Sequence, residues 1–465
     1  MLSKRIPLLL SSLLVAGISI NSSAETLKDI YSLSLDNDPQ LRADEYAYQA
    51  GKEALTISRS YLLPQVSAQA VYSDTEQKNS QPFTTGSSPQ QFKSESENST
   101  YSATLTQPIF NMAAWFGYKQ GKSLSKLAEA QFSAAQQNLI IRTSEAYFNV
   151  LRAIDNMTTA QSEEKALHHQ LEQTRQRFEV GLTAITDVHE AQAAYDNATA
   201  TTLGAKGQLG ISFEELSALT GQSHDKVAPL AQAFPVNNPV PATREAWVEA
   251  SLQNNYSLKT AKLNSKASKS NARSKASSHM PTISAQIMYT DMNDTNTDLS
   301  SDTFPSFSND ARSFDGTTFA LQLDMPIFSG FRASGERRQA YAQHGEAQEI
   351  YNKTQRDIIQ GSRALHLSVV TGVAQVKARQ QAITSSNSAL EATQAGYEVG
   401  TRNLVDVLIA QRNLFNAKRN FDNTRYDYII NMLKLKEVAG NLTPEDILTL
   451  DKWLDIENQV KRTSF

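Results

Sequence analysis

The sequence predicts an α+β membrane protein with an internal duplication, in which four β-strands per chain cross the membrane and continue into long α-helical coiled coils. Three observations predict this fold. The chain opens with an export signal, its landmarks recur at a near-constant offset, and each copy joins alternating strands to a very long helical stretch. At 465 residues the chain could form two or three ordinary domains or one elongated one.

The N-terminal segment indicates secretion. Lys4 and Arg5 precede an apolar run over Ile6–Ile18, and Ser22–Ala24 supplies small residues for a cleavage site. The run is too short and wrongly flanked for a membrane-spanning helix, although an uncleaved anchor is the alternative. We expect a signal peptide over 1–24 and a mature chain that starts near Glu25.

Composition excludes several classes of partner and cofactor. The formal charge is −4, from 44 basic and 48 acidic residues, and it becomes −6 without Lys4 and Arg5. We see no basic stripe and therefore expect no nucleic-acid partner. The chain has no cysteine for a disulfide or a lipid anchor. The mature chain also lacks an apolar run long enough to span a bilayer as a helix, so a membrane would have to be entered by a β-barrel.

Five landmarks recur along the chain in the same order. The first pair is Pro64 and Pro281, each of which precedes a segment where apolar and polar residues alternate. The offset along the chain between the two members of a pair changes by no more than two positions in the later pairs. Each copy is therefore a whole multi-element half, because the period is far too long for a solenoid. The later pairs are Gln107–Phe110 with Met325–Phe328, Glu179–Gly181 with Glu398–Gly400, Asp187–Val188 with Asp406–Val407, and Leu219–Gly221 with Val438–Gly440.

Each copy is expected to contain a hairpin of two strands. After a helix over Leu27–Ser60, apolar and polar residues alternate, as in strands of about ten residues. The polar stretches Thr75–Thr100 and Met292–Thr317 are predicted to be mobile loops in solvent. An ordinary soluble hairpin is the alternative. The expected apolar faces are Val66, Ala68, Ala70 and Tyr72; Tyr101, Ala103 and Leu105; Ile283, Ala285, Ile287 and Tyr289; and Phe319, Leu321 and Leu323.

Long helices are expected to follow the strands. The stretch Met112–Phe178 has no proline and is rich in Ala, Gln, Leu, Lys, Arg and Glu, and Gly330–Val399 behaves alike. Such a helix is roughly 100 Å long at about 1.5 Å per residue. Helices of this length must pack side by side as coiled coils, and small residues such as Ala128, Ala134 and Ala135 allow close approach.

Four strands per chain cannot close a barrel, because about eight is the smallest number seen. An open sheet in lipid would leave unpaired edges, so copies of the chain must pool their strands. A dimer would supply eight strands and a trimer twelve. Only the larger number leaves room for a lumen, so the trimer follows if the protein is a duct.

Several motifs carry a resemblance to a known family, and their order and duplication are more specific than any one of them. The chain resembles the TolC family of outer-membrane channel-tunnels over essentially its whole mature length. The motifs are Asn37–Arg42, Leu62–Gln65, Gln107–Phe110, Ala146–Leu151, Gln176–Val188 and Ala395–Leu408.

The resemblance implies a homotrimer whose twelve-stranded β-barrel, with four strands per chain, sits in the outer membrane. An α-helical coiled-coil barrel then extends into the periplasm, ringed by a mixed equatorial domain. It implies repeats over 25–225 and 247–440, an equatorial connector over 226–246 that contains four prolines, and a C-terminal equatorial segment over 441–465. The implied partners are outer-membrane lipid, a periplasmic adaptor (membrane fusion) protein, and an inner-membrane efflux pump or ABC exporter.

Gly181 and Gly400 fall where the long helices must turn, and glycine suits a residue that needs a positive φ. By resemblance these turns are the docking surface for the adaptor, whereas a plain tight turn is the alternative. The implied docking residues are Val180, Gly181, Leu182, Thr183, Val399, Gly400 and Thr401.

A polar cluster lies beside these turns. By resemblance, Asp187 bonds the Tyr397 hydroxyl, Arg402 bonds Thr186 or Asp187 of a neighbour, and Gln176 joins the network that holds the mouth shut. Arg402 suits such a latch because its guanidinium can donate several hydrogen bonds. A solvated helix end with casual ion pairs is the alternative.

Asp406 is, by resemblance, the constriction aspartate, which in a trimer would place three carboxylates around one axis and attract cations. One turn on, Ile409 stands where the best-known members carry a second aspartate. We therefore expect weaker block by cations than in two-ring members.

No catalytic constellation, phosphate loop or metal site is recognised in the sequence, and His168 and His169 lack a third ligand. We expect no enzyme and no cofactor. The leading hypothesis is a passive exit duct for multidrug efflux and type I protein secretion. A pore-less periplasmic tether or adhesin and an unassisted nutrient porin are the alternatives.

Overall fold

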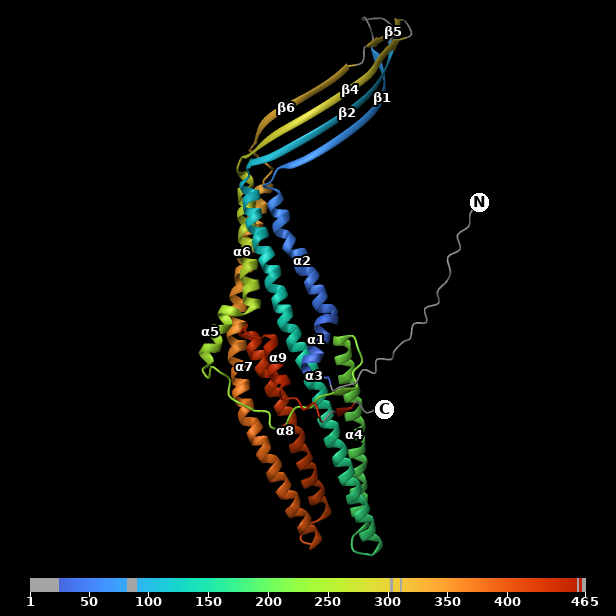
Figure 1. Ribbon diagram of the computed structural model, residues 1–465, viewed down its shortest axis with the longest axis vertical. Coiled ribbons are helices and arrows are strands. Elements are labelled where there is room, and N and C mark those ends of the chain that lie inside the picture. The colour runs from blue at the N-terminus through green and yellow to red at the C-terminus, as the bar shows by residue number, and fades with distance from the viewer. Residues whose placement is uncertain (1–24, 82–89, 302–303, 310–311, 458–459, 462–465) are drawn as a thin grey trace, which may run out of the picture.

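The computed structural model describes residues 25–81, 90–301, 304–309, 312–457 and 460–461. They form an elongated molecule with a β-sheet at one end and two helical hairpins at the other (Figure 1). The predicted signal peptide lies outside the described residues. The first copy comprises α1 (Leu27–Asn37), α2 (Pro39–Ser60), β1 (Gln65–Gln81), β2 (Gln90–Phe110), α3 (Met112–Glu179) and α4 (Ile185–Thr220).

The second copy repeats this order after a short strand, β3 (Lys226–Val227), and an irregular connector. A further helix, α9 (Pro444–Asp451), and a last strand, β7 (Val460–Lys461), follow the second copy. The elements of the second copy are α5 (Arg244–Asn254), α6 (Tyr256–Ala276), the 3-10 turn η1 (Ser277–His279), β4 (Thr282–Ser301), β5 (Phe304–Asn309), β6 (Arg312–Asp324), α7 (Arg332–Glu398) and α8 (Leu404–Val438).

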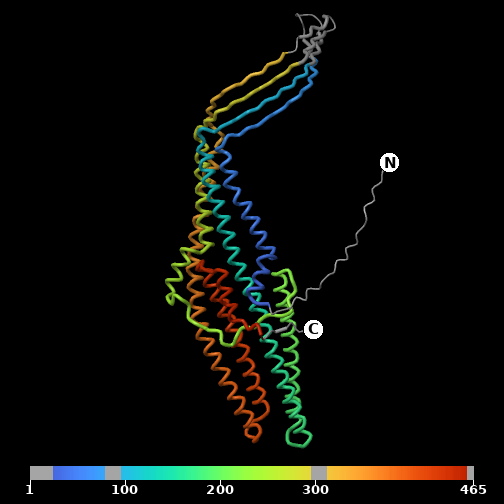
Figure 2. Tube along the Cα trace, viewed as in Figure 1, coloured from blue at the N-terminus to red at the C-terminus, as the bar shows by residue number. Residues whose placement is uncertain are grey.

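The long helices form as the sequence predicts. The two longest, α3 and α7, have 68 and 67 residues and run from the sheet to the far end of the molecule (Figure 2). Asn111 caps α3, because its side-chain oxygen accepts from the Ala114 N–H at 2.9 Å. The helix expected over Leu27–Ser60 is instead two helices. Asp38 ends α1 and caps α2, whose first residue is Pro39.

Small residues let α2 and α3 approach closely, as the sequence suggested for Ala128. A Cβ atom built on Gly51 would lie 2.5 Å from the Cβ of Ala128, and one on Gly121 would lie 2.5 Å from the Ala54 carbonyl oxygen. In the described part of the chain, no helix is both long and apolar enough to cross a membrane.

The sheet is antiparallel, and the pairing of β2 with β4 joins the two copies. The predicted alternation is confirmed by the register. Val66 pairs with Leu105, Leu105 with Ile287, and Ile287 with Phe319, so one apolar row crosses β1, β2, β4 and β6 on one face. Val66 and Phe319 are 74% and 75% exposed. Among the described residues, β1 forms one edge of the sheet, and β6 with the short β5 forms the other, since both pair with β4.

The strands are longer than predicted. We expected about ten residues per strand, but β1, β2 and β4 have 17, 21 and 20 residues. Much of the stretches predicted to be loops, Thr75–Thr100 and Met292–Thr317, is therefore paired strand. The ladder of backbone hydrogen bonds continues after the apolar alternation stops, because Ser, Thr and Asn pair through their backbones as well as apolar residues do. Part of each stretch lies outside the described residues.

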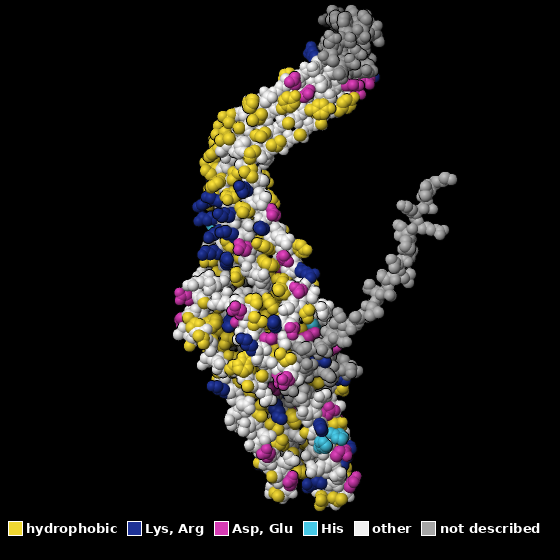
Figure 3. All heavy atoms as spheres, in the orientation of Figure 1, with side chains coloured by type: hydrophobic (Ala, Val, Ile, Leu, Met, Phe, Trp, Pro, Cys, Tyr) yellow, Lys and Arg dark blue, Asp and Glu magenta, His cyan; other side chains and the backbone are white. Residues whose placement is uncertain are grey.

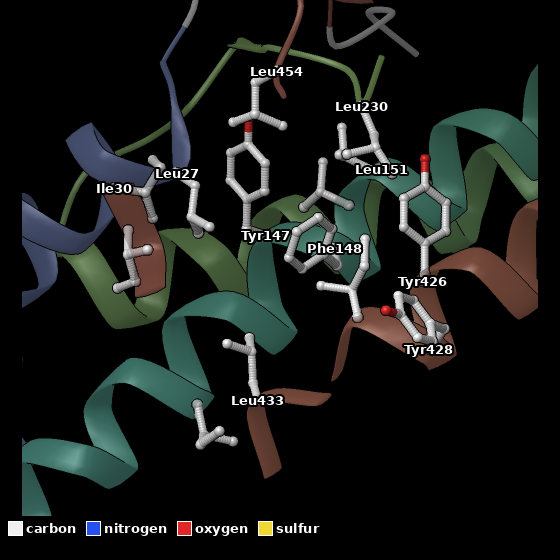
Figure 4. Close-up of a cluster of buried hydrophobic side chains, with 14 of the residues drawn as sticks. Leu27, Ile30, Tyr147, Phe148, Leu151, Leu230, Tyr426, Tyr428, Leu433 and Leu454 are labelled. Carbon is white, nitrogen blue, oxygen red and sulfur yellow. The ribbon is translucent and has the colours of Figure 1, made fainter. Parts of the chain in front are cut away.

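The hydrophobic core lies at the waist, where the middle of α3 meets α1, α4, α8 and α9. Figure 4 shows Tyr147 and Phe148 of α3 between Leu27 and Ile30 on one side and Tyr426 on the other. The Tyr147 hydroxyl donates to the Ala228 carbonyl at 2.7 Å, which fixes the connector to α3. Close to this core, β3 pairs with β7.

Candidate functional site: the tips of the helical hairpins

The end of the molecule far from the sheet consists of two helical turns of the same design. In the first, Gly181 has φ +77°, and in the second Gly400 has φ +80°. The Leu182 N–H donates to the Arg177 carbonyl at 2.8 Å, and the Thr401 N–H donates to the Gly396 carbonyl at 2.9 Å. Each helix thus ends in a Schellman motif, whose left-handed residue is glycine. The predicted need for a positive φ at both glycines is confirmed.

Apolar side chains project into solvent from both turns. Val180 and Leu182 are 70% and 69% exposed, and Val399 is 75% exposed. Thr401 is also exposed, and Thr183 is half-buried. Isolated exposed apolar residues are ordinary, but the same position is apolar and exposed in both copies at adjacent ends of one molecule. The predicted docking residues therefore lie together at one end.

Asp187 stands in the first turn of α4, where a carboxylate interacts favourably with the helix dipole. It accepts a hydrogen bond from the Thr183 hydroxyl. The predicted bond between Asp187 and the Tyr397 hydroxyl is not formed in the protomer, where the described hydrogen-bond donor to the Asp187 side chain is Thr183 on the same turn. Gln176 and Thr186 are exposed, and within the described residues their side chains make no hydrogen bond.

Tyr397 is buried where the two hairpins meet. Its ring packs with Leu171 of α3, Ala191 of α4, and Leu404 and Val407 of α8. The Arg177 guanidinium lies over this ring, with its carbon 4.9 Å from the ring centroid. The Tyr397 hydroxyl is buried and has no hydrogen-bond partner among the described residues. A buried hydroxyl without a partner costs about 1–3 kcal/mol.

Arg402 and Asp406 face each other within one turn. The Arg402 guanidinium lies 3.7 Å from the Asp406 carboxylate, and both side chains are partly exposed. The Asp406 N–H donates to the side chain of Asn403, which caps α8. A solvated pair of this kind contributes about 0–1 kcal/mol. Arg402 is thus held loosely on its own chain.

Ile409 lines a groove between α8 and α4. The floor of this groove includes Leu167 of α3, and its wall carries an ion pair in which Arg419 lies 2.7 Å from Glu163. Ile409 therefore puts an apolar side chain one turn from the Asp406 carboxylate.

Two residues of this site were not predicted from the sequence. Arg177 lies within the motif Gln176–Val188, but its stacking on Tyr397 could not be predicted, because it depends on how two distant helices pack. Asn403 could have been found, because Asn directly before a helical run is a capping signal.

The described residues contain no cluster of three His, Asp or Glu that could hold a metal ion. His168 and His169, which lack a third metal ligand in the sequence, both lie on α3. The His168 ring contacts the Tyr195 ring of α4, with the two ring centroids 5.1 Å apart. Both histidines are exposed.

The fold is that of outer-membrane channels. The structure of the Campylobacter jejuni CmeC outer membrane channel superposes with a TM-score of 0.71 at 18% identity, and the match covers 97% of this chain and 98% of that one. This likeness defines the class by fold alone.

The sequence comparison defines the family. The model of the family described as outer membrane efflux protein matches residues 30–222 and 247–441. Outer membrane protein TolC of Vibrio cholerae is 33% identical over 98% of this chain and 99% of its own length. Proteases secretion protein PrtF of Dickeya chrysanthemi is 27% identical over 95% of this chain and 94% of its own. The chain belongs to the outer membrane efflux protein family and is an outer-membrane protein, which confirms the predicted resemblance.

Proposed function

We propose that this protein is a homotrimeric, passive exit duct that spans the outer membrane and the periplasm. The observation that carries the proposal is the open sheet, which has an exposed apolar row and two unpaired edges, β1 and β6. Edges of this kind are not tolerated in lipid, so neighbouring copies must pair them. Three copies give twelve strands, which is enough to leave a lumen.

The tips of the hairpins supply the docking surface and the gate in this proposal. The exposed residues Val180, Leu182 and Val399 contact a periplasmic adaptor protein. In the trimer, Arg402 leaves Asp406 for Thr186 or Asp187 of the neighbouring protomer, and the Tyr397 hydroxyl gains the partner that it lacks in a single chain. Each bond is weak, which suits a mouth that docking must open.

The duct performs no chemistry of its own, and it is neither an enzyme nor a cofactor protein. Energy comes from an inner-membrane efflux pump or ABC exporter that docks through the adaptor. The cargo is small molecules in efflux and proteins in type I secretion, in keeping with a family named for efflux and a relative named for protease secretion.

Conductance of single channels in planar bilayers tests this function. The unmodified protein is expected to conduct weakly, and Tyr397→Phe with Arg402→Ala is expected to conduct several-fold more, because both latch bonds are lost. A matched control is Tyr341→Phe with Arg356→Ala, which changes the same residue types on α7 away from the tips and should leave conductance unchanged.

Three results would contradict the proposal. No conductance from any variant favours the pore-less tether or adhesin. A fully open unmodified channel favours the unassisted porin. Equal conductance of the double variant and its control rejects the latch while leaving the duct in place.

A further inference from the structure

The exposed face of α6 is a stripe of positive charge. This helix of 21 residues carries six Lys and Arg residues and no Asp or Glu. Five of the six recur at intervals of three and four positions, so they lie on one face, and all five are exposed. The expectation that the mature chain has no basic stripe is therefore wrong, because an acidic total conceals this local excess. The five are Lys259, Lys262, Lys266, Lys269 and Arg273.

The charge is not a general requirement of the fold. The counterpart of α6 in the first copy is α2, and the two helices begin at equivalent positions, because their caps, Asp38 and Asn255, have the same spacing as Pro64 and Pro281. Yet α2 carries three basic and three acidic residues. The same structural role is thus filled by a helix without net charge.

A second stripe on α3 adjoins the first. Lys119, Lys122 and Lys126 are exposed and have the same spacing. The Ser274 hydroxyl of α6 donates to the Ala113 carbonyl of α3 at 2.8 Å. Lys119 and Arg273 both lie over the Phe116 ring, at 5.5 and 5.8 Å from its centroid. We call the eight cations of the two stripes the basic face.

The charges of the basic face are not neutralised within the described part of the protomer. None of the eight is in an ion pair there, whereas Lys275, on another side of α6, lies 3.1 Å from Glu336. Eight like charges on two packed helices repel one another. A bound anion would relieve this repulsion.

An apolar collar lies between the basic face and the sheet. Trp115 is 44% exposed, and the Lys119 ammonium lies 5.3 Å from the centroid of its ring. Ile327, Phe328 and Phe331, between β6 and α7, are also exposed. Figure 3 shows Lys and Arg side chains gathered on the stem just below the sheet, and hydrophobic side chains over the adjoining part of the sheet. Exposed aromatic residues followed by cations are typical of a membrane–water interface.

We propose that the part of the basic face nearest the sheet binds the anionic headgroups of phospholipids in the leaflet that faces the periplasm. The proposal rests on the proposed function, in which the sheet lies in the outer membrane. Attraction between a basic segment and an anionic surface fades within a Debye length, about 8 Å at physiological salt. Only the cations close to the collar can therefore take part.

Helix geometry ranks the cations by distance. At about 1.5 Å per residue, Arg273 lies about 5 Å from the end of α6, and Lys269 and Lys119 lie about 10 Å from the ends of their helices. Lys262 and Lys126 lie about 20 Å away, and Lys259 is farther still. The first three should bind lipid headgroups, and the last three should not.

Quenching of tryptophan fluorescence by brominated lipids measures this binding. The chain has three tryptophans, and only Trp115 lies at the collar, since Trp247 on α5 and Trp453 after α9 lie at the waist. The purified protein is reconstituted with brominated phosphatidylglycerol or brominated phosphatidylcholine in turn. We expect at least about a fivefold preference for the anionic lipid, which is the attraction that a single basic residue near the surface gives.

Two variants with equal loss of charge separate contact from a general field. Lys119→Gln with Lys269→Gln and Arg273→Gln should lower the preference to near one, and about 1 M salt should do the same to the unmodified protein. Lys126→Gln with Lys259→Gln and Lys262→Gln should keep the preference.

Equal preference in all three proteins, or equal loss in both variants, overturns the lipid site. The latter result would mean that the basic face attracts anionic lipid through its total charge and not through contacts of the three cations nearest the sheet. Quenching of Trp115 by both lipids without preference overturns the inference but leaves the membrane position intact. No quenching by either lipid contradicts the proposed function, because the collar then lies outside the bilayer.

Discussion

Asp422 of α8 is the clearest titrating group away from the sheet. Burial, and then the nearby Asp155 carboxylate, raise the pKa of Asp422 to about 6, although Arg425 and Lys418 oppose the shift. Burial also raises the pKa of Asp155, which accepts a hydrogen bond from the Tyr426 hydroxyl at 2.5 Å. A carboxyl whose pKa is higher in the folded state than in the unfolded state favours folding in its protonated form. Its contribution is fully present below about pH 4 and is lost as the pH rises to about 6.

Asp422→Asn should therefore stabilise the protein at pH 8 and leave it unchanged near pH 4. The gain in free energy of unfolding is about 2 kcal/mol, allowing for the partial exposure of the group. Thermal unfolding midpoints across this pH range check it. Asp427→Asn is the matched control, since Asp427 is exposed and lies 2.6 Å from Arg152, and its removal should bring no gain. An equal difference between Asp422→Asn and the unmodified protein at both pH values would show that Asp422 is not the titrating group.

At the scale of elements, helix ends and close approaches decide which glycines are irreplaceable. Gly181 and Gly440 both have positive φ, +77° and +71°. A Cβ at Gly181 would meet nothing within 4 Å, whereas one at Gly440 would lie 2.5 Å from the backbone carbonyl of Asn254, at the end of α5. The first turn needs glycine for its backbone alone, and the second needs it for space as well.

Gly181→Ala should cost about 1–2 kcal/mol, because alanine is strained in the left-handed conformation. Gly440→Ala should cost clearly more and reduce the yield of folded protein, because neither backbone can move without breaking the cap of α8. Thermal midpoints and the yield of folded oligomer measure the difference. Gly204→Ala, inside α4 and in open space, should be neutral or slightly stabilising. Similar losses for the variants at 181 and 440 would show that the contact with Asn254 is relaxed in solution.

For the whole molecule, the proposed trimer multiplies each residue at the tips by three. Asp406→Asn should lower the preference for cations and the block by divalent cations, because three carboxylates leave one axis. Ile409→Asp should strengthen that block by adding a second ring one turn away. Reversal potentials in a salt gradient measure both effects. Glu398→Gln removes an equal charge from the end of α7, and an identical response from this control would assign the selectivity to general surface charge.

Much of this molecule could be predicted from sequence because its signals are local. The apolar alternation near Val66, the helical composition after Met112 and the glycine at each turn depend on neighbours a few residues away. Because the chain is duplicated, each element could be predicted twice, once from each copy. The lengths of the strands could not be predicted in this way, since polar residues beyond Ser73 pair through their backbones and leave no pattern in the side chains.

Local sequence patterns were enough to predict the long helices, the two glycine turns and the apolar face of the sheet. The tertiary structure added the pairing of β2 with β4, the hydrogen bond from Thr183 to Asp187, and the position of Arg177 over the Tyr397 ring. It also joined the cations of α3 and α6 into one face through Phe116. The reason is physical. Periodicity and capping act within a few residues, whereas these contacts depend on the register between elements that are far apart in the chain, or on competition between nearby hydrogen-bond partners.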